Sequence, residues 1–276
     1  MKRLLLLVIA FAGVISYGQE TPAQYLKRYE TLVKYVGPGG PGVETLLDNW
    51  YKVDSTDVTM LFARFSCFYT KSAKDTVISG TSRKYLGSKP VLTVRDTLGN
   101  PVYYFNATVF DDKLFTQALD NIDKAISYDN TRIDFRTQKI NALLQYEKES
   151  PDIASSMILD LIAENYSKQP LWRTSEGSVG EGFFPDVIEG YCTMLYKTGS
   201  PVSYSAFKEI STVMMKREPG HSEFVDNMGT YELVVKGNAN KARKYYNKAL
   251  RINPDDDTAR KNLSVIEKMQ VKTKKK

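Results

Sequence analysis

The sequence predicts an all-α protein, a solenoid of helical hairpins that carries one small β-hairpin insertion. Two observations indicate this fold. Apolar residues recur at helical spacing along most of the chain, and glycine, proline or polar residues separate these stretches. One stretch alone, residues 89–110, changes to the alternation that is typical of strands.

The first 18 residues predict a secretory signal peptide. Lys2 and Arg3 precede an apolar run from Leu4 to Ile15, and small or polar residues follow. Because this run is too short to span a bilayer, we expect cleavage before Gln19 and a mature chain without a transmembrane segment. The predicted location is periplasmic or secreted, and an uncleaved anchor is the alternative.

Residues 19–88 are predicted to form N-terminal helical hairpins. The segments 21–36, 43–53 and 55–72 have helical periodicity, and the sequence GPGGPG at 37–42 separates the first two. A phosphate-binding loop is a poorer interpretation of GPGGPG, because its prolines lack amide protons and no Lys-Ser/Thr pair follows.

Residues 89–110 are predicted to form the β-hairpin insertion. The segment from Pro90 to Phe110 alternates and is rich in valine, tyrosine, phenylalanine and threonine, and Asp96 to Asn100 supply a turn.

Helical periodicity returns at residues 111–166. Ala118 and Ala125 lie on one side of a helix, and a new helix begins at Arg132. A third helix follows, with Ser150 as its expected N-cap.

The segment 167–187 is predicted to be a long loop with exposed aromatic residues, Trp172, Phe183 and Phe184. Long loops within compact folds are often functional. The alternative is that these aromatic side chains fold back and cover the side of the solenoid.

Residues 188–270 are predicted to form further hairpins and a capping helix, followed by a basic tail at 271–276. A helix at 222–237 ends at Gly237, and the next helix places Ala242, Tyr246 and Ala249 on one face before Pro254 terminates the unit.

This pattern resembles the tetratricopeptide repeat (TPR), a helical hairpin with small residues where its helices meet, an aromatic residue late in the second helix and a terminal proline. The matching residues are Gly229 or Thr230, Gly237, Ala242, Tyr246, Ala249 and Pro254. Ala118 and Ala125 repeat the spacing in residues 111–166. The chain also resembles secreted TPR proteins of Gram-negative bacteria, in which a sequence like RDTLGNPVYYF followed by FDDKLFTQALDNIDKAI occurs. The resemblance implies a TPR-like α-α superhelix and no particular activity.

The titratable residues predict no catalytic, cofactor-binding or metal site. His221 is the only histidine, no G-x-S-x-G motif is present, and neither Cys67 nor Cys192 has a neighbour at ligand spacing. We therefore expect His221 to be a turn residue. Both cysteines lie in apolar helical stretches, which favours two buried thiols over a disulfide.

The net charge of +6 does not predict nucleic-acid binding. Lys2, Arg3 and the four lysines among residues 272–276 account for the whole excess, so the folded part is balanced. A weak contact between the tail and an anionic envelope surface is an alternative that the sequence leaves open.

The leading functional hypothesis is a non-catalytic scaffold outside the cytoplasm that binds a peptide or protein partner on the superhelix surface. The candidate contacts are Arg136, Lys139, Trp172, Asn227 and Tyr231. One alternative is a glycan- or cell-wall-processing enzyme with the Trp172 loop as a sugar platform. Another is a structural subunit of an envelope assembly.

Four tripeptides that begin at Asp54, Asp75, Asp96 and Asp257 match a bacterial O-glycosylation pattern, Asp-Ser/Thr followed by an apolar residue or threonine. Asp-Ser/Thr pairs are also ordinary turn and N-cap sequences, so both interpretations stand.

Overall fold

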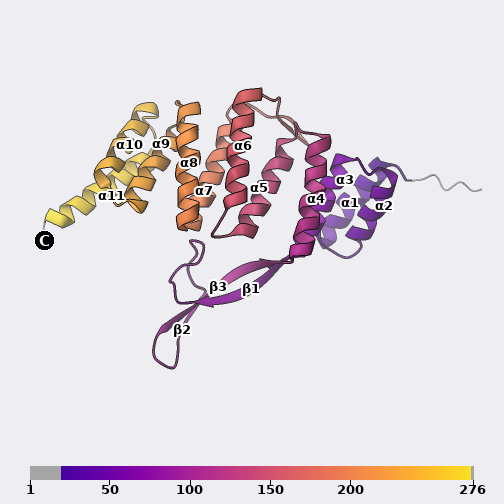
Figure 1. Ribbon diagram of the computed structural model, residues 1–276, viewed down its shortest axis with the longest axis horizontal. Helices are drawn as coiled ribbons and strands as arrows, with labels where there is room; N and C mark the ends of the chain where they lie inside the picture. Colours follow the sequence, from indigo (N-terminus) through magenta and orange to yellow (C-terminus); the bar gives the residue numbers. More distant parts are fainter. Residues whose placement is uncertain (1–19, 275–276) are drawn as a thin grey trace, which may run out of the picture.

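The computed structural model describes residues 20–274 and is mostly helical, with a small antiparallel sheet (Figure 1). The predicted signal peptide therefore lies outside the described residues. The helices are α1 (Pro22–Val36), α2 (Val43–Val53), α3 (Val58–Ser72), α4 (Asp112–Tyr128), α5 (Ile133–Glu147), α6 (Asp152–Lys168), α7 (Phe183–Thr198), α8 (Pro201–Arg217), α9 (Ser222–Thr230), α10 (Ala239–Ile252) and α11 (Asp257–Lys274). No helix in this part of the chain is long and apolar enough to cross a membrane.

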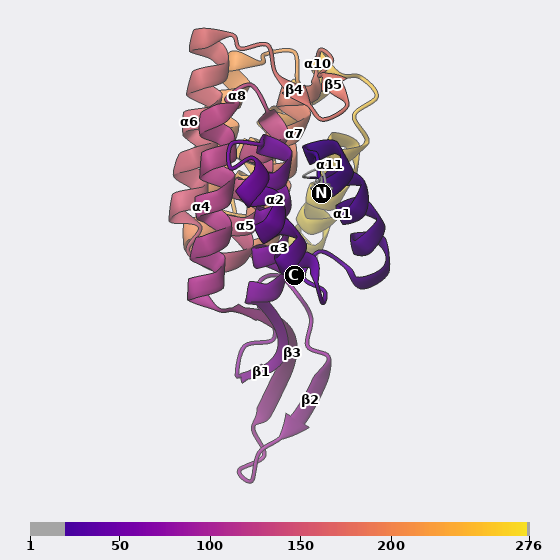
Figure 2. The same ribbon diagram turned by 90° about the vertical axis from the view of Figure 1, so that its right-hand side faces the viewer.

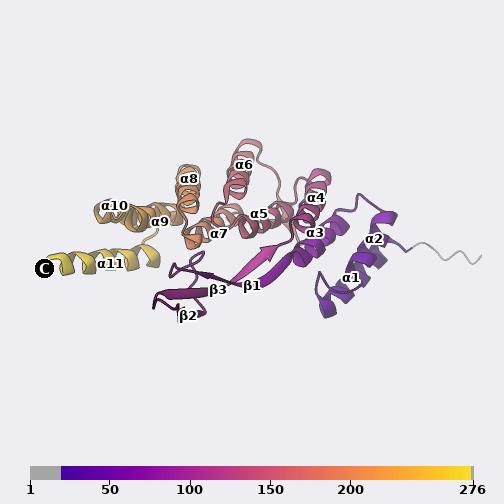
Figure 3. The ribbon, with the colours of Figure 1, turned by 60° about the horizontal axis from the view of Figure 1, so that its bottom comes forward.

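The helices stack as a curved, two-layered array. Figure 3 shows α4, α6, α8 and α10 in one row and α3, α5, α7 and α9 in a second row. The two ends of the array, α1 and α11, lie on the side of the second row (Figures 2 and 3). This side, which we call the inner face, is therefore the one toward which the array bends.

The sheet connects the two helices of one hairpin. Helices α3 and α4 pack together, and residues 73–110 between them form β1 (Ala73–Gly80), β2 (Leu92–Arg95) and β3 (Pro101–Phe110) in the order β1-β3-β2. The expected hairpin at 89–110, with its turn at Asp96 to Asn100, is present as β2 and β3.

The sheet has three strands and not the predicted two. Ala73–Gly80 fall within residues 19–88, for which helical hairpins are predicted, but this segment continues directly from α3 as a strand that pairs with β3. Its register places Ile78 opposite the buried Phe105, so the apolar face of β3 stabilises it. This pairing partner lies about 30 residues further on, beyond any local sequence pattern.

Polar side chains cap several of the helices. Thr21 and Gln24 form a capping box on α1, and the side chains of Asp57 and Asp111 cap α3 and α4. Ser150 does not cap α6. The carboxylate of Glu147 accepts hydrogen bonds from the amides of Ile153 (2.7 Å) and Ala154 (2.8 Å) instead.

The core consists of three clusters along the array, formed by the N-terminal, central and C-terminal helices. Cys67 belongs to the N-terminal cluster and Cys192 to the central one, and both are free and buried, as predicted. The predicted packing residues Ala118, Ala125, Ala242, Tyr246 and Ala249 are all fully buried.

The C-terminal hairpin differs from the expected pattern in one turn. Residues Tyr231–Val235 form a π-helix, in which the amide of Lys236 bonds to the carbonyl of Tyr231. Within this turn Leu233 packs on the C-terminal cluster, whereas Val234 is 50% exposed. Gly237 then ends the segment with a positive φ of 65°, as expected of a C-terminal cap.

Pro254 lies just beyond α10, which ends at Ile252. The tail is less irregular than the sequence suggests, since α11 continues to Lys274.

Candidate binding groove

A cavity of about 710 Å³ lies between the sheet and the C-terminal ends of α5 and α7. We call it the sheet groove. Residues 75–77 of β1 and 106–108 of β3 line one wall. Leu144, Gln145 and Lys148 from the end of α5, and Met194, Lys197 and Thr198 from the end of α7, line the opposite wall. Figure 1 shows that the sheet leaves α3 and reaches past the lower end of α5 toward α7.

Gly87 anchors a third wall of the sheet groove, which is formed by Tyr85, Leu86 and Ser88. It lies in the segment between β1 and β2, has a φ of 75°, and packs so closely on α7 that a Cβ atom would lie 1.9 Å from the carbonyl oxygen of Lys197. Only glycine fits such an approach. The same segment is tied to the sheet, because Tyr85 packs on Phe105 (ring centroids 5.9 Å apart) and Arg83 donates to the hydroxyl of Tyr103 (3.1 Å).

The sheet groove has a positive and hydrogen-bonding lining. Among the described residues, neither Lys148 nor Lys197 makes an ion pair, while the carboxylate of Asp75 accepts a hydrogen bond from Thr108 (3.1 Å). Hydroxyl and amide side chains and apolar side chains make up the rest of the lining. Such a surface suits a neutral or acidic polar ligand better than a basic one.

The predicted contact residues Arg136 and Lys139 hold helices together. The guanidinium of Arg136 pairs with Glu164 on α6 (3.0 Å) and lies 5.3 Å from the ring centroid of Trp172. The amine of Lys139 pairs with Asp123 on α4 (2.6 Å), and the side chain is 17% exposed. Both charges are therefore largely engaged within the array.

Trp172 is buried, contrary to the expectation that it is exposed. It is 6% exposed, and its ring nitrogen donates to Asn165 (2.9 Å). Phe184 is also buried, and both residues belong to the central cluster. The loop is shorter than residues 167–187, because α7 begins at Phe183 and a two-stranded ribbon, β4 (Arg173–Thr174) and β5 (Gly177–Ser178), occupies its middle.

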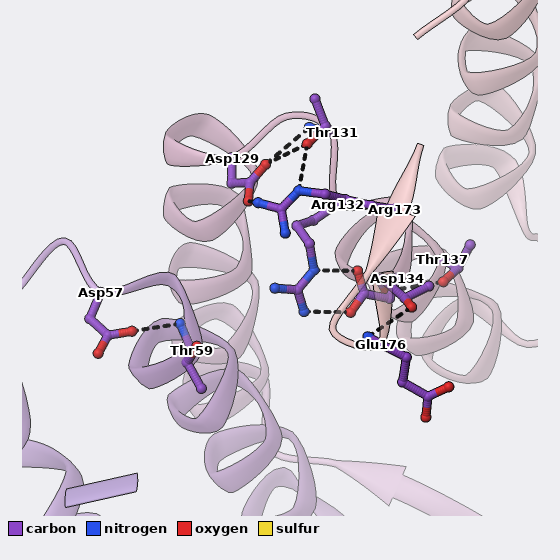
Figure 4. Close-up of polar contacts among 10 residues, drawn as sticks. Asp57, Thr59, Asp129, Thr131, Arg132, Asp134, Thr137, Arg173 and Glu176 are labelled. Carbon is purple, nitrogen blue, oxygen red and sulfur yellow. Dashed lines mark hydrogen bonds and ion pairs between the residues drawn. The ribbon is translucent and has the colours of Figure 1, made fainter. Parts of the chain in front are cut away.

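A polar network fixes this ribbon to the turn between α4 and α5 (Figure 4). Arg173 donates to the hydroxyl of Thr131 (3.2 Å) and pairs with Asp129. Arg132 forms a two-pronged pair with Asp134 (2.6 and 2.8 Å). The loop therefore covers the side of the array, which was the alternative interpretation from the sequence.

The last two predicted contacts, Asn227 and Tyr231, lie in the C-terminal hairpin. Tyr231 is 8% exposed, and the amines of Lys208 and Lys236 lie 5.5 and 5.8 Å from its ring centroid. The buried amide nitrogen of Asn227 has no hydrogen-bond partner in the structure.

Asp226, next to Asn227, forms a buried pair with Asp256. The two residues are 4% and 8% exposed. Burial, the hydrogen bond to Asp256 and the negative charges of Asp256 and Glu223 raise the pKa of Asp226 to about 8. Asp256 caps α11 through the amide of Ala259 (3.0 Å). Although burial opposes ionisation, hydrogen bonds from Ala259, Ser222 and Asp226 keep the pKa of Asp256 below its usual value.

The other titratable residues considered in the sequence analysis, His221 and the two cysteines, have structural roles. His221 begins α9 and its amide bonds to the carbonyl of Glu218 (3.1 Å), which agrees with a turn residue. Burial raises the pKa of the Cys192 thiol to about 12 and also raises that of Cys67. The described residues contain no group of three or more histidine, cysteine, aspartate or glutamate side chains that could hold a metal ion.

The sequence did not indicate the sheet groove. Lys148 and Lys197 lie 49 positions apart, and only the stacking of α5 beside α7 brings their ends to one cavity. Thr76 and Ile78 lie two positions apart, as residues on one face of a strand do. This pattern is too short to distinguish a strand from the end of a helix.

The chain matches no protein-family model, and the search of curated proteins finds no significant relative.

Proposed function

We propose that this protein is a non-catalytic, TPR-like interaction scaffold that acts outside the cytoplasm and binds a peptide or a protein partner. The observation that carries this proposal is the combination of a curved, two-layered helical array with an accessible groove of about 710 Å³ at its edge. Curved arrays of helical hairpins offer extended surfaces of the kind that bind peptides and partner helices.

The close packing within the C-terminal hairpin supports the TPR-like interpretation. Gly229 on α9 lies against the ring of Tyr246 on α10, and the hydroxyl groups of Thr230 and Tyr246 are 3.2 Å apart. Ala242 and Ala249 are fully buried on the same helix. These contacts support the proposal, since small residues let two helix axes approach closely, which is the arrangement expected of a TPR hairpin.

The expected partner contacts shift from the predicted residues to the sheet groove and the inner face. Trp172 and Tyr231 offer little accessible surface, and Arg136 and Lys139 are engaged in ion pairs. Lys148 and Lys197 are free of ion pairs within the described chain and are better placed for a partner. Trp172 is 6% exposed, so it offers little surface for the sugar platform of the alternative enzyme hypothesis.

The test is affinity purification of the mature chain with envelope extract from the producing cells, followed by reconstitution with the purified partner. Slower amide exchange in α3, α5, α7, α9 or the sheet groove upon binding would support the proposal. Turnover of a glycan by the pure protein, abolished by a single carboxylate substitution, would replace it with the enzyme hypothesis.

A further inference from the structure

We propose that β1 binds an extended, acidic segment of the partner protein as an additional strand along its free edge. This inference rests on the proposed scaffold function and names the binding mode and the chemistry of the ligand.

The hydrogen-bond register identifies which backbone groups of β1 are free. The amide of Asp111 bonds to the carbonyl of Ser72 (2.8 Å), and the amide of Asp96 bonds to the carbonyl of Asn100 (2.9 Å). Backbone groups of successive residues in a strand point to opposite sides. The odd-numbered residues of β3 therefore face β1 and the even-numbered residues face β2.

The same alternation applies to β1. Thr76 lies opposite Ala107 and Ile78 opposite Phe105, so these two residues carry the bonds to β3. Asp75, Val77 and Ser79 therefore direct their amide and carbonyl groups away from the sheet, where they make no backbone bond to any other described segment. They form a row of about 14 Å, which fits five residues of an extended chain.

This edge is less protected than the opposite edge of the sheet. β2 has four residues, follows Pro90, and the guanidinium of its Arg95 donates to the carbonyl of Gly99. β1 has eight residues and no proline, and its charged side chains, Lys74 and Asp75, lie near its start. Natural sheets normally shorten, charge or cover an open edge, so an eight-residue open edge beside a cavity is suited to strand addition.

Charge selects an acidic segment. Asp75 and Val77 lie opposite Thr108 and Asn106, and all four line the wall of the sheet groove that faces Lys148 and Lys197. The side chains that an added strand directs to this face of the sheet would therefore lie on the same side as the two amines. The one carboxylate of the groove lining, Asp75, is hydrogen-bonded by Thr108. Val77 is 58% exposed and offers an apolar contact to the added strand. A segment that alternates apolar and acidic residues would satisfy both features.

The experiment titrates the whole mature protein with three synthetic heptapeptides while residue-resolved amide exchange is followed by NMR. The first alternates valine and glutamate, the second has lysine in place of glutamate, and the third is the first with N-methylated amides at alternate positions. With the acidic peptide, we expect exchange of the Asp75, Val77 and Ser79 amides to slow by about tenfold or more, while the amides of Thr76 and Ile78 change little.

The two control peptides make the result decisive. Equal binding of the N-methylated peptide would overturn backbone pairing, and equal binding of the lysine peptide would overturn the charge selection. Absence of binding by the acidic peptide would overturn the proposal as a whole. The Lys148→Glu and Lys197→Glu variants should each weaken binding of the acidic peptide, whereas Lys168→Glu, exposed on α6, should not. The three peptide titrations use the wild-type protein, so their results hold even if a lysine variant fails to fold.

Failure here is distinguishable from failure of the scaffold function. A protein partner whose binding slows exchange on α5, α7 or α9 but leaves Asp75, Val77 and Ser79 unchanged would retain the scaffold and overturn strand addition.

Discussion

Gly229 on α9 lies directly beneath the ring of Tyr246 on α10, where a Cβ atom would lie 2.7 Å from Cε1 of the tyrosine. Tyr246 is fully buried, so its ring has little freedom to move aside. We expect Gly229→Ala to lower the free energy of unfolding by about 1–3 kcal/mol through overpacking. Urea or thermal unfolding followed by circular dichroism would measure the change.

Gly190→Ala is the matched control for that substitution. Gly190 also lies within a helix, α7, but a Cβ atom there would meet nothing within 4 Å. Alanine has the higher helix propensity, so this variant should be unchanged or more stable by up to about 1 kcal/mol. If both variants melt alike, the close contact between α9 and α10 is not an important determinant of stability.

Gly87→Ala should detach the segment 81–91 from α7. The added Cβ would collide with the backbone oxygen of Lys197, which cannot move without unwinding the end of the helix. We expect faster cleavage by trypsin after Arg83 and Lys84, detected by mass spectrometry, and loss of the groove wall formed by Tyr85, Leu86 and Ser88. Gly99→Ala is the control, since Gly99 also has a positive φ of 84° but nothing lies within 4 Å of its Cβ position. Similar cleavage of both variants would contradict the anchoring role of Gly87.

The pair of Asp226 and Asp256 predicts a pH-dependent stability. The folded protein retains the proton of Asp226 up to a pKa of about 8, whereas the unfolded chain releases it near the ordinary value of 3.8. Protons therefore favour the folded state, and its stability falls as the pH rises from about 4 to about 8, by at most about 1.4 kcal/mol per pH unit. Urea unfolding at a series of pH values would measure this slope.

Asp226→Asn should flatten that slope. An amide can donate the hydrogen bond to Asp256 at every pH, so the variant should be more stable than the wild type at pH 8 and similar at pH 4. Asp257→Asn is the control, because it also removes one carboxylate, at an exposed position next to Asp256. This variant should leave the slope unchanged. A wild-type curve with no fall in this range would show that Asp226 is ionised in the folded state.

The two thiols should stay free and unreactive in the folded protein, even in an oxidising environment. Cys67 and Cys192 are 1% and 0% exposed, lie in different clusters, and both have raised pKa values because of burial. We expect an aromatic disulfide reagent at pH 8 to titrate two thiols in denaturant and none without it. Recovery of no thiol after denaturation under non-reducing conditions would instead indicate a disulfide.

Local sequence rules predicted much of the helical framework. Gly237 and Pro254 mark the ends of units, and the alanines of α4 and α10 are buried as their spacing indicates. These features depend on residues within one or two helical turns, so a single sequence contains the necessary information.

The exceptions involve partners distant in the chain or competition between neighbours. Ser150 does not cap α6, because the Glu147 carboxylate accepts hydrogen bonds from two amides at the start of that helix. Trp172 is covered because Asn165 and Arg136 are brought to it by the packing of α5 and α6. Loop residues with bulky aromatic side chains gain free energy from burial whenever the fold provides a place for them.

By itself, the sequence determined a chain of amphipathic helices with small residues at close contacts and one β segment, because helical and strand periods are properties of short stretches. Only the tertiary structure decided that β1 joins β2 and β3, that α3 and α4 form one hairpin across that insertion, and that Lys148 and Lys197 meet at one groove. These relationships depend on pairing and stacking between segments separated by tens of residues, which no local pattern specifies.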